Sequence, residues 1–166
     1  MERSGCATCG AEVLTIIQVS RPDDVEIVRN LFLEYQALLG VDLCFQDFES
    51  EVRDLPGEYV PPSGRLFLAR NDGAPVGCVA LRAFHGSRCE MKRLFARPAA
   101  RGLGVGRALV TRVMDEARAI GYAEMVLDTL PTMTEAQHLY LAFGFHPIPP
   151  YRPNPVPGAL FMGREL

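Results

Sequence analysis

The sequence predicts one mixed α/β domain, of the α+β type, behind a short N-terminal extension. At 166 residues the chain has the length of a single domain that can bury a full core. Its 48% hydrophobic and 22% charged residues are usual for a globular protein. Apolar positions switch repeatedly between strand-like runs and helical spacings of three and four, with no repeat and no long linker. We therefore expect an extension over residues 1–12 and a domain over residues 13–166.

The first third of the domain predicts a strand followed by two helices. Residues 14–19 form a β-branched run typical of a strand, and a proline-containing acidic turn follows. From residue 25 the apolar positions fall on one helical face, which ends at Gly40. A shorter acidic helix is expected over residues 46–55, before two Pro- and Gly-rich breaks.

The middle of the chain predicts an antiparallel meander. Strands are expected over residues 65–70 and 76–83, because the Asn-Asp-Gly turn at residues 71–73 between them is a hairpin signal. A third strand over residues 89–95 follows a turn containing His85 and Gly86. Three consecutive strands therefore precede the next helix.

The last third predicts alternating helices and strands. Residues 105–120 place apolar side chains on one stripe, and Gly121 is suited to cap the C-terminal end of this helix. A strand over residues 122–130 and a helix over residues 132–143, stopped by Gly144, follow. Six prolines between Pro147 and Pro157 precede a final strand over residues 159–164.

Composition excludes several classes of protein. A net charge of −3 argues against general nucleic-acid binding. No apolar run approaches the length of about 18 residues that a membrane span requires, and the N-terminus lacks the pattern of a secretory signal. We therefore expect a cytoplasmic protein without nucleic-acid or membrane partners.

Cys6 and Cys9 have the CxxC spacing of zinc knuckles and dithiol redox sites. A tetrahedral zinc site needs further ligands, and Cys44 and His85, the nearest candidates, have no second metal-binding spacing. We expect no metal and place the pair in the extension, while a metal or redox switch stays open as an alternative.

A Gly-rich turn between the strand over residues 89–95 and the helix over residues 105–120 carries the main chemical signal. Gly102, Gly104 and Gly106 remove Cβ atoms from a helix N-terminus, which can then bind phosphate through its backbone N–H groups. Between residues 88 and 112 seven cationic side chains oppose Glu90 alone. A P-loop would need Lys after the last glycine, and a Rossmann turn would need a different spacing. The glycines alone agree with two interpretations, a loop that binds a phosphorylated cofactor and a plain surface turn.

Two motifs resemble the GNAT superfamily of acyl-CoA-dependent N-acetyltransferases. The turn from Arg101 to Gly106 is similar to the family's Arg/Gln-x-x-Gly-x-Gly/Ala loop. The sequence AQHLYLAFGF from Ala136 to Phe145 is similar to its Ala-x-x-Leu-Tyr-x-x-x-Gly-Phe helix end. Met133 departs from the pattern, because many members have Asn there. The resemblance does not assign the acceptor.

The resemblance implies the fold and a cofactor site. The fold would be a bent, mixed and mostly antiparallel sheet of about seven strands with about four helices, splayed between the fourth and fifth strands. Acetyl-CoA would lie in this split as the co-substrate. Its pantetheine would bind the backbone of Leu94, Phe95 and Ala96, and its pyrophosphate would bind the amides of Gly102, Leu103, Gly104, Val105, Gly106 and Arg107, with the Arg101 and Arg107 side chains nearby.

The resemblance also implies two catalytic roles. An alkyl ammonium with a pKa of about 10.4 must lose a proton before it attacks a thioester. Glu90 occupies the position of the family's general base, although a structural ion pair with Lys92 or Arg88 is the alternative. Tyr140 occupies the position of the general acid that protonates the leaving thiolate, and a plain core aromatic is the alternative. A backbone N–H near Leu94 would stabilise the oxyanion.

The acceptor is expected to be a primary amine of a small molecule, amino acid or peptide, which attacks directly in a ternary complex. Arg152 and Asn154, in the Pro-rich segment, are candidate acceptor contacts. An acidic cluster has two interpretations, attraction of a cationic amine through charge complementarity or a solvated helix face. It comprises Asp42, Asp47, Glu49, Glu51, Asp54 and Glu58. The three histidines are expected to be structural or solvated. A non-catalytic acyl-CoA-binding or sensing module is the alternative function, and a monomer or homodimer is expected.

Overall fold

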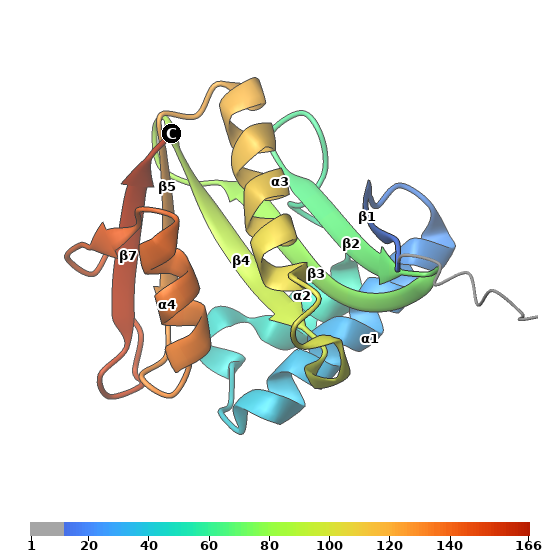
Figure 1. Cartoon of the computed structure of the whole chain (residues 1–166). Helices are drawn as coiled ribbons and strands as arrows, with labels where there is room; N and C mark the ends of the chain where they lie inside the picture. The colour runs from blue at the N-terminus through green and yellow to red at the C-terminus, as the bar shows by residue number, and fades with distance from the viewer. Residues whose placement is uncertain (1–11) are drawn as a thin grey trace, which may run out of the picture.

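A seven-stranded sheet with the order β1-β2-β3-β4-β5-β7-β6 is the centre of the fold (Figure 1). The computed structural model describes residues 12–166. Only β4 and β5 are parallel neighbours, and every other pair is antiparallel. The strands are β1 (Leu14–Gln18), β2 (Arg65–Asn71), β3 (Ala74–Ala83), β4 (Arg88–Ala96), β5 (Glu124–Thr129), β6 (His146–Pro147) and β7 (Leu160–Glu165).

Helices cover both faces of the sheet. In Figure 1, α3 and α4 lie in front of the sheet, and α1 and α2 lie behind it. The helices are α1 (Pro22–Leu39), α2 (Phe48–Asp54), α3 (Val105–Ile120) and α4 (Thr134–Ala142). Short 3₁₀ turns occur at Cys44–Gln46 and Pro98–Ala100. No helix among residues 12–166 is both long and apolar enough to cross a membrane.

The expected mixed sheet with four helices is confirmed, with differences at three places. The first helix begins at Pro22, because proline is well suited to the first helical turn. The helix expected over residues 46–55 is divided into a 3₁₀ turn and α2, with Asp47 in a left-handed conformation between them. The short strand β6 was not predicted, because it contains Pro147 and proline argues against a strand. The sheet tolerates Pro147 here because β6 lies at its edge. Cys6 and Cys9 lie outside the described residues.

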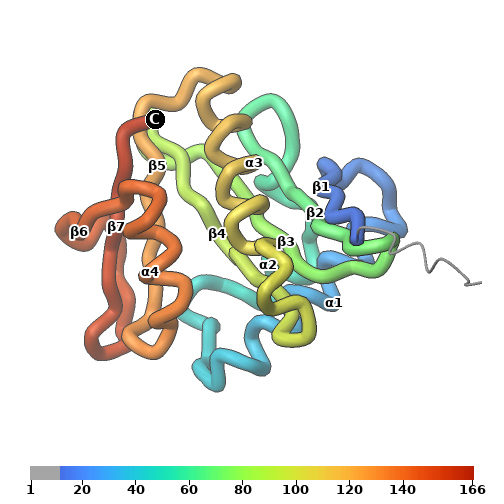
Figure 2. Tube along the Cα trace, viewed as in Figure 1, coloured from blue at the N-terminus to red at the C-terminus, as the bar shows by residue number. Residues whose placement is uncertain are grey.

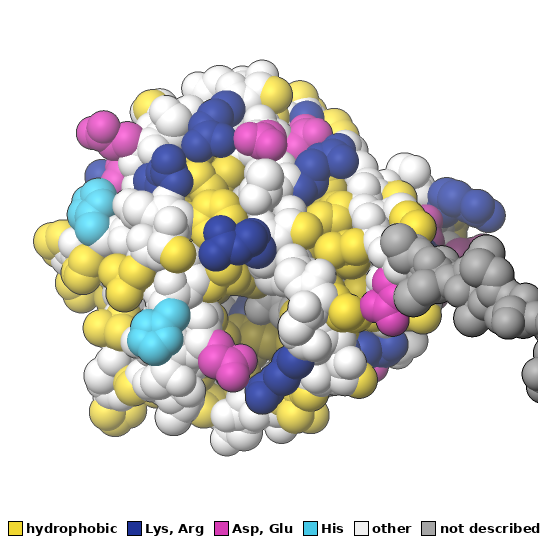
Figure 3. All heavy atoms as spheres, in the orientation of Figure 1, with side chains coloured by type: hydrophobic (Ala, Val, Ile, Leu, Met, Phe, Trp, Pro, Cys, Tyr) yellow, Lys and Arg dark blue, Asp and Glu magenta, His cyan; other side chains and the backbone are white. Residues whose placement is uncertain are grey.

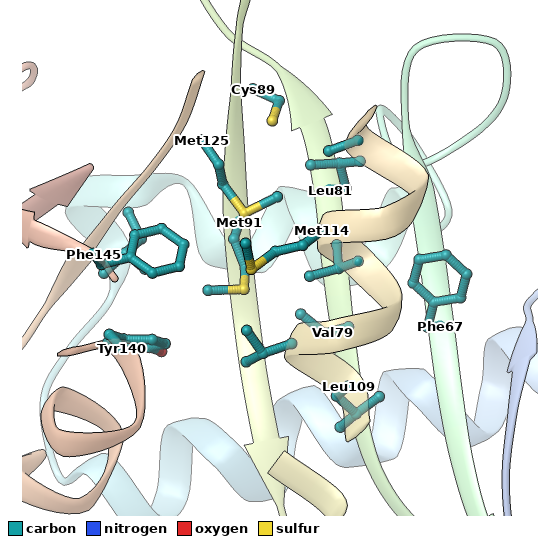
Figure 4. Close-up of a cluster of buried hydrophobic side chains, with 14 of the residues drawn as sticks. Phe67, Val79, Leu81, Cys89, Met91, Leu109, Met114, Met125, Tyr140 and Phe145 are labelled. Atoms are coloured by element: carbon teal, nitrogen blue, oxygen red, sulfur yellow. The ribbon is translucent and has the colours of Figure 1, made fainter. Parts of the chain in front are cut away.

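Two apolar clusters fill the space on either side of the sheet. The cluster under α1 and α2 includes Phe32 and Phe48, both almost fully buried. In the cluster under α3, Leu109 is 0% exposed, and Figure 4 shows Met91 and Met114 meeting beside this helix. Such burial on both faces explains why the central strands are apolar runs with little alternation.

The sheet opens between β4 and β5. Only three residue pairs join the two strands, from Arg88–Glu124 to Glu90–Val126. Beyond Glu90 the strands separate, as Figure 2 shows. The predicted splay between the fourth and fifth strands is therefore confirmed.

We expect Leu109→Ala to lower the free energy of unfolding by about 2–5 kcal/mol, because it removes a fully buried side chain and leaves a cavity under α3. Leu141→Ala is the matched control, since this helical leucine is 53% exposed. Urea denaturation of both variants measures the difference. Equal losses would contradict the assignment of Leu109 to the core.

Candidate functional site

A cavity of about 550 Å³ lies where the sheet opens. Figure 3 shows a hollow in the lower half of the face that carries α3 and α4. The cavity is bounded by the end of β4, the Gly-rich turn, the start of α4 and one side of α1. Of the predicted cofactor residues it contacts Leu94, Phe95, Ala96, Arg101, Gly102, Gly104, Val105 and Gly106.

Two predicted cofactor residues lie outside the cavity lining. Leu103 is 37% exposed, and the Arg107 guanidinium lies 5.4 Å from the centre of the Phe143 ring. Arg101 lines the cavity and also contacts Glu135 at 3.7 Å, with both side chains largely exposed. The turn therefore offers its backbone and glycines to the cavity more than its cationic side chains.

The Gly-rich turn has the geometry of an anion site. Gly102 and Gly104 have φ values of 82° and 73°, which favour glycine. Gly104 is the N-cap of α3, and no side chain caps this end. Within residues 12–166 the N–H groups of Gly104, Val105 and Gly106 donate to no protein acceptor. These unpaired donors and the positive end of the helix dipole fit a phosphate group.

A bulge in β4 shapes the opposite end of the cavity. Ala80 pairs with Lys92 and Cys78 pairs with Phe95, so the strand gains an extra residue between them. Arg93 has a φ of 57° there and is held by Glu51, with nitrogen–oxygen distances of 3.0 and 2.6 Å. This two-bond contact fixes α2 against β4. The bulge directs the following strand segment into the opening.

Tyr140 lies at the inner end of the opening. The residue is 5% exposed, and its ring packs edge-on against Phe145 with the ring centres 5.9 Å apart. It lines a second, smaller cavity of about 30 Å³, together with Leu94 and Met133, which also line the large cavity. Burial raises the pKa of the Tyr140 phenol. The phenol therefore stays protonated and can donate a proton or hydrogen bond.

Glu90 is fully buried in an ion-pair network. Arg82 contacts its Oε2 at 2.8 Å, Arg152 contacts its Oε1 at 3.0 Å, and the Tyr151 hydroxyl donates to Oε1 at 3.0 Å. The alternative given for Glu90, a structural ion pair, is present but not with the partners named for it: Arg88 instead pairs with Glu124 at 2.8 Å. Within the described chain, Lys92 has no carboxylate within salt-bridge distance.

Arg152 and Asn154 converge on Asp128 of β5. The Arg152 Nη2 and the Asp128 Oδ1 are 2.7 Å apart, and the Asn154 Nδ2 donates to Oδ2 at 3.0 Å. These contacts fold the Pro-rich segment over the sheet. Asn154 and Asp128 line the smaller cavity, whereas the Arg152 Nε is buried without a hydrogen-bond partner in the described structure.

The acidic cluster divides between a pocket and solvent. A pocket of about 360 Å³ beside α2 and Arg82 is lined by Asp47, Glu51, Asp54 and Glu58. Glu58 contacts Arg82 at 2.7 Å, so part of the acidic charge is already paired. Gln46 lines both this pocket and the smaller cavity, which makes the two neighbours. The three histidines are exposed, in agreement with the expectation for them.

Sequence reasoning missed Asp128 and Lys92 as residues of the site. Asp128 is a carboxylate that directly follows the apolar run from Met125 to Leu127 in β5, and this pattern was available as a signal. Lys92 is the only lysine among the 17 Lys and Arg residues of the chain. The residue is 6% exposed, and it lines the smaller cavity. Among residues 12–166 no group of three or more metal-ligating side chains was found.

Comparisons with known proteins agree with the geometry. Residues 27–145 match the model of the acetyltransferase (GNAT) family. An uncharacterized N-acetyltransferase of Schizosaccharomyces pombe is 40% identical over 92% of this chain and 95% of its own length. An IAA acetyltransferase of Azospirillum brasilense is 39% identical over 63% of this chain and 70% of its own. A GNAT-family acetyltransferase structure from Staphylococcus aureus Mu50 superposes with a TM-score of 0.77, at 22% identity, over 92% of this chain and 99% of that one.

Gly104→Glu is expected to weaken acetyl-CoA binding by about 100-fold, or about 2.7 kcal/mol. The new carboxylate would stand among the unpaired N–H groups and repel phosphate. Gly121→Glu is a matched control, because Gly121 caps the opposite end of the same helix with a φ of 104°. Isothermal titration calorimetry measures both dissociation constants. An equal loss in the two variants would argue against a phosphate site at Gly104.

Proposed function

Because the chain belongs to the acetyltransferase (GNAT) family, we propose that it transfers an acetyl group from acetyl-CoA to a primary amine in a ternary complex. The observation that carries this proposal is that the two cavities in the opened sheet adjoin each other. The large cavity begins at the uncapped N-terminus of α3 and shares Leu94 and Met133 with the smaller cavity at Tyr140. A long phosphorylated thioester would thus place its two ends at chemically different sites.

The backbone supports binding of acetyl-CoA at both ends of the large cavity. Bound acetyl-CoA would supply an acetyl group activated as a thioester. The N–H groups of Gly104, Val105 and Gly106 would bind its phosphates. The strand segment from Leu94 to Ala96 would bind the extended pantetheine arm through backbone hydrogen bonds. Met133, where many family members have Asn, replaces one polar contact by an apolar one.

Tyr140 would protonate the leaving sulfur. It comes from α4, borders the cavity that adjoins Leu94 and keeps its proton because burial disfavours the phenolate. Its phenol therefore keeps its proton at physiological pH. A backbone N–H near Leu94, after the bulge, would stabilise the oxyanion.

The acidic pocket supports an amine as the acceptor. Three of its four carboxylates are paired with Arg53, Arg82 or Arg93, so the remaining attraction for a cation would come mainly from Asp47. Gln46 joins the pocket to the smaller cavity. Arg152 and Asn154 would act on the acceptor side by holding Asp128 in place. Glu90 would position strand β3 and the Pro-rich segment. Both of its oxygens are occupied by contacts with Arg82, Arg152 and Tyr151.

An amine panel tests this function. Purified protein is incubated with acetyl-CoA and small amines, amino acids or short peptides, and CoA release is measured with a thiol reagent. Release that depends on one class of amine supports the proposal and names the acceptor class. Acetyl-CoA binding in calorimetry without release for any amine would favour the alternative, a non-catalytic acyl-CoA-binding or sensing module.

Tyr140→Phe is expected to lower kcat by about 10²- to 10³-fold, because the proton donor is lost, while the acetyl-CoA dissociation constant stays unchanged. Tyr122→Phe serves as control, since the Tyr122 hydroxyl donates to Ser63 O at 2.7 Å, away from both cavities. Steady-state kinetics and calorimetry separate the two effects. A Tyr140→Phe variant with full kcat, when chemistry is the slow step, would show that Tyr140 is not the acid.

A further inference from the structure

Lys92 is a buried lysine in a chain that otherwise uses only arginine for its basic side chains. It lies on β4 directly before the bulge at Arg93 and is 6% exposed. Its side chain lines the smaller cavity together with Tyr140 and Asp128. Lys92 therefore borders the space in which the acceptor nitrogen and the thioester would meet.

The charges around Lys92 balance without it. Each of three buried or half-buried arginines has a carboxylate partner: Arg82 pairs with Glu90, Arg93 with Glu51, and Arg152 with Asp128. The Lys92 Nζ instead donates to the Gln46 Oε1 at 3.2 Å. A buried ammonium without a carboxylate partner is costly, so the surroundings favour the neutral amine.

The ionisation of Lys92 agrees with this geometry. Burial, followed by the positive charge of Arg93, lowers its pKa to about 7. Glu90 opposes the shift, whereas Arg152 and Arg82 add to it. The other titratable groups that border the same cavity, or couple to Lys92, are Tyr35 of α1, Glu51 of α2, Asp128 of β5 and Tyr140 of α4. A neutral Lys92 has a nitrogen lone pair near physiological pH, which an arginine never has.

Glu90 lacks the access that a base requires. It is fully buried and borders none of the three cavities described above. Both of its oxygens already accept hydrogen bonds or ion pairs from Arg82, Arg152 and Tyr151. A general base must reach the proton it removes, directly or through one water. The smaller cavity, with about 30 Å³, has room for an amine group or a water beside Lys92.

We propose that Lys92 is the general base that removes a proton from the acceptor ammonium, a role that rests on the proposed function. The neutral Nζ takes one proton and becomes an ammonium. The freed amine lone pair forms the C–N bond, and the C–S bond breaks as the Tyr140 phenol gives its proton to sulfur. The new amide nitrogen returns a proton to the Tyr140 oxygen. Lys92 then releases its proton to solvent, so one proton is released for each acetyl group transferred.

The ionisation of Lys92 can be measured without turnover. Protein labelled with ¹³C-lysine contains a single lysine Cε, whose NMR shift is followed from pH 5 to pH 11 with and without acetyl-CoA. We expect one inflection near pH 7, and Lys92→Arg verifies the assignment because its signal disappears. An inflection near pH 10 or higher would overturn the role of Lys92.

Kinetics test whether the neutral form is the active one. We expect kcat/KM of the wild type to rise with pH below about 7 and to level off above it, because the base must be deprotonated. Lys92→Met and Lys92→Arg should both lower kcat by about 10²- to 10⁴-fold. Their kcat/KM should continue to rise toward the pKa of the free amine, at about 10. Thermal melting and acetyl-CoA binding verify that both variants are folded.

Glu90→Gln separates the two candidate bases. Since Glu90 raises the pKa of Lys92, its neutralisation should shift the low-pH rise of kcat/KM to lower pH without removing it. If the low-pH rise of kcat/KM disappeared in this variant, or if Lys92→Arg kept full kcat, the inference would be overturned. Absence of CoA release from wild-type protein that binds acetyl-CoA and shows the inflection near pH 7 would instead overturn the proposed function, and the inference with it.

Discussion

The separation of β4 from β5 after three residue pairs is the constraint on which the rest of the structure depends. A parallel pair normally continues its hydrogen bonds along both strands. Here the pairing stops at Glu90, and the bulge at Arg93 follows on the other edge of β4. The strand end therefore has backbone that neither neighbour fully occupies. The two cavities, Tyr140 and the start of α3 are all arranged around that end.

Buried ion pairs hold the opening in this shape. Glu90 joins β4 to β3 through Arg82 and to the Pro-rich segment through Arg152, which also reaches Asp128 on β5. Such pairs add little net stability, because the desolvation of each charge offsets their attraction. Their geometry is nevertheless specific, since loss of one partner leaves a buried charge unpaired. The network therefore sets the position of the strands and the covering segment more than it sets the stability of the fold.

Local sequence patterns predicted the helices, the strands and the Gly-rich turn, whereas they did not predict ion pairs between residues far apart in the sequence. Helical spacing, hairpin residues and the glycines from Gly102 to Gly106 act within short stretches, and the structure has these features at the expected positions. The partners of Glu90 could not be read in this way. Arg88 and Lys92 are close in sequence, but Arg152 reaches Glu90 only because the Pro-rich segment folds back over the sheet. β6 was missed for a related reason, since only its edge position tolerates Pro147.

In the proposed function, the two ends of the opening would use different chemical groups for a physical reason. At the start of α3, backbone N–H groups would bind phosphate, so side chains there would need only be absent or small. At the β4 end, the proposed acetyl transfer would require groups that change protonation state, and backbone amides cannot do this. Arginine cannot do so either. Lys92, Tyr140 and Tyr35 border the smaller cavity, and burial favours the neutral form of each of them. Burial thus gives the same cavity a neutral amine that can accept a proton and a neutral phenol that can donate one.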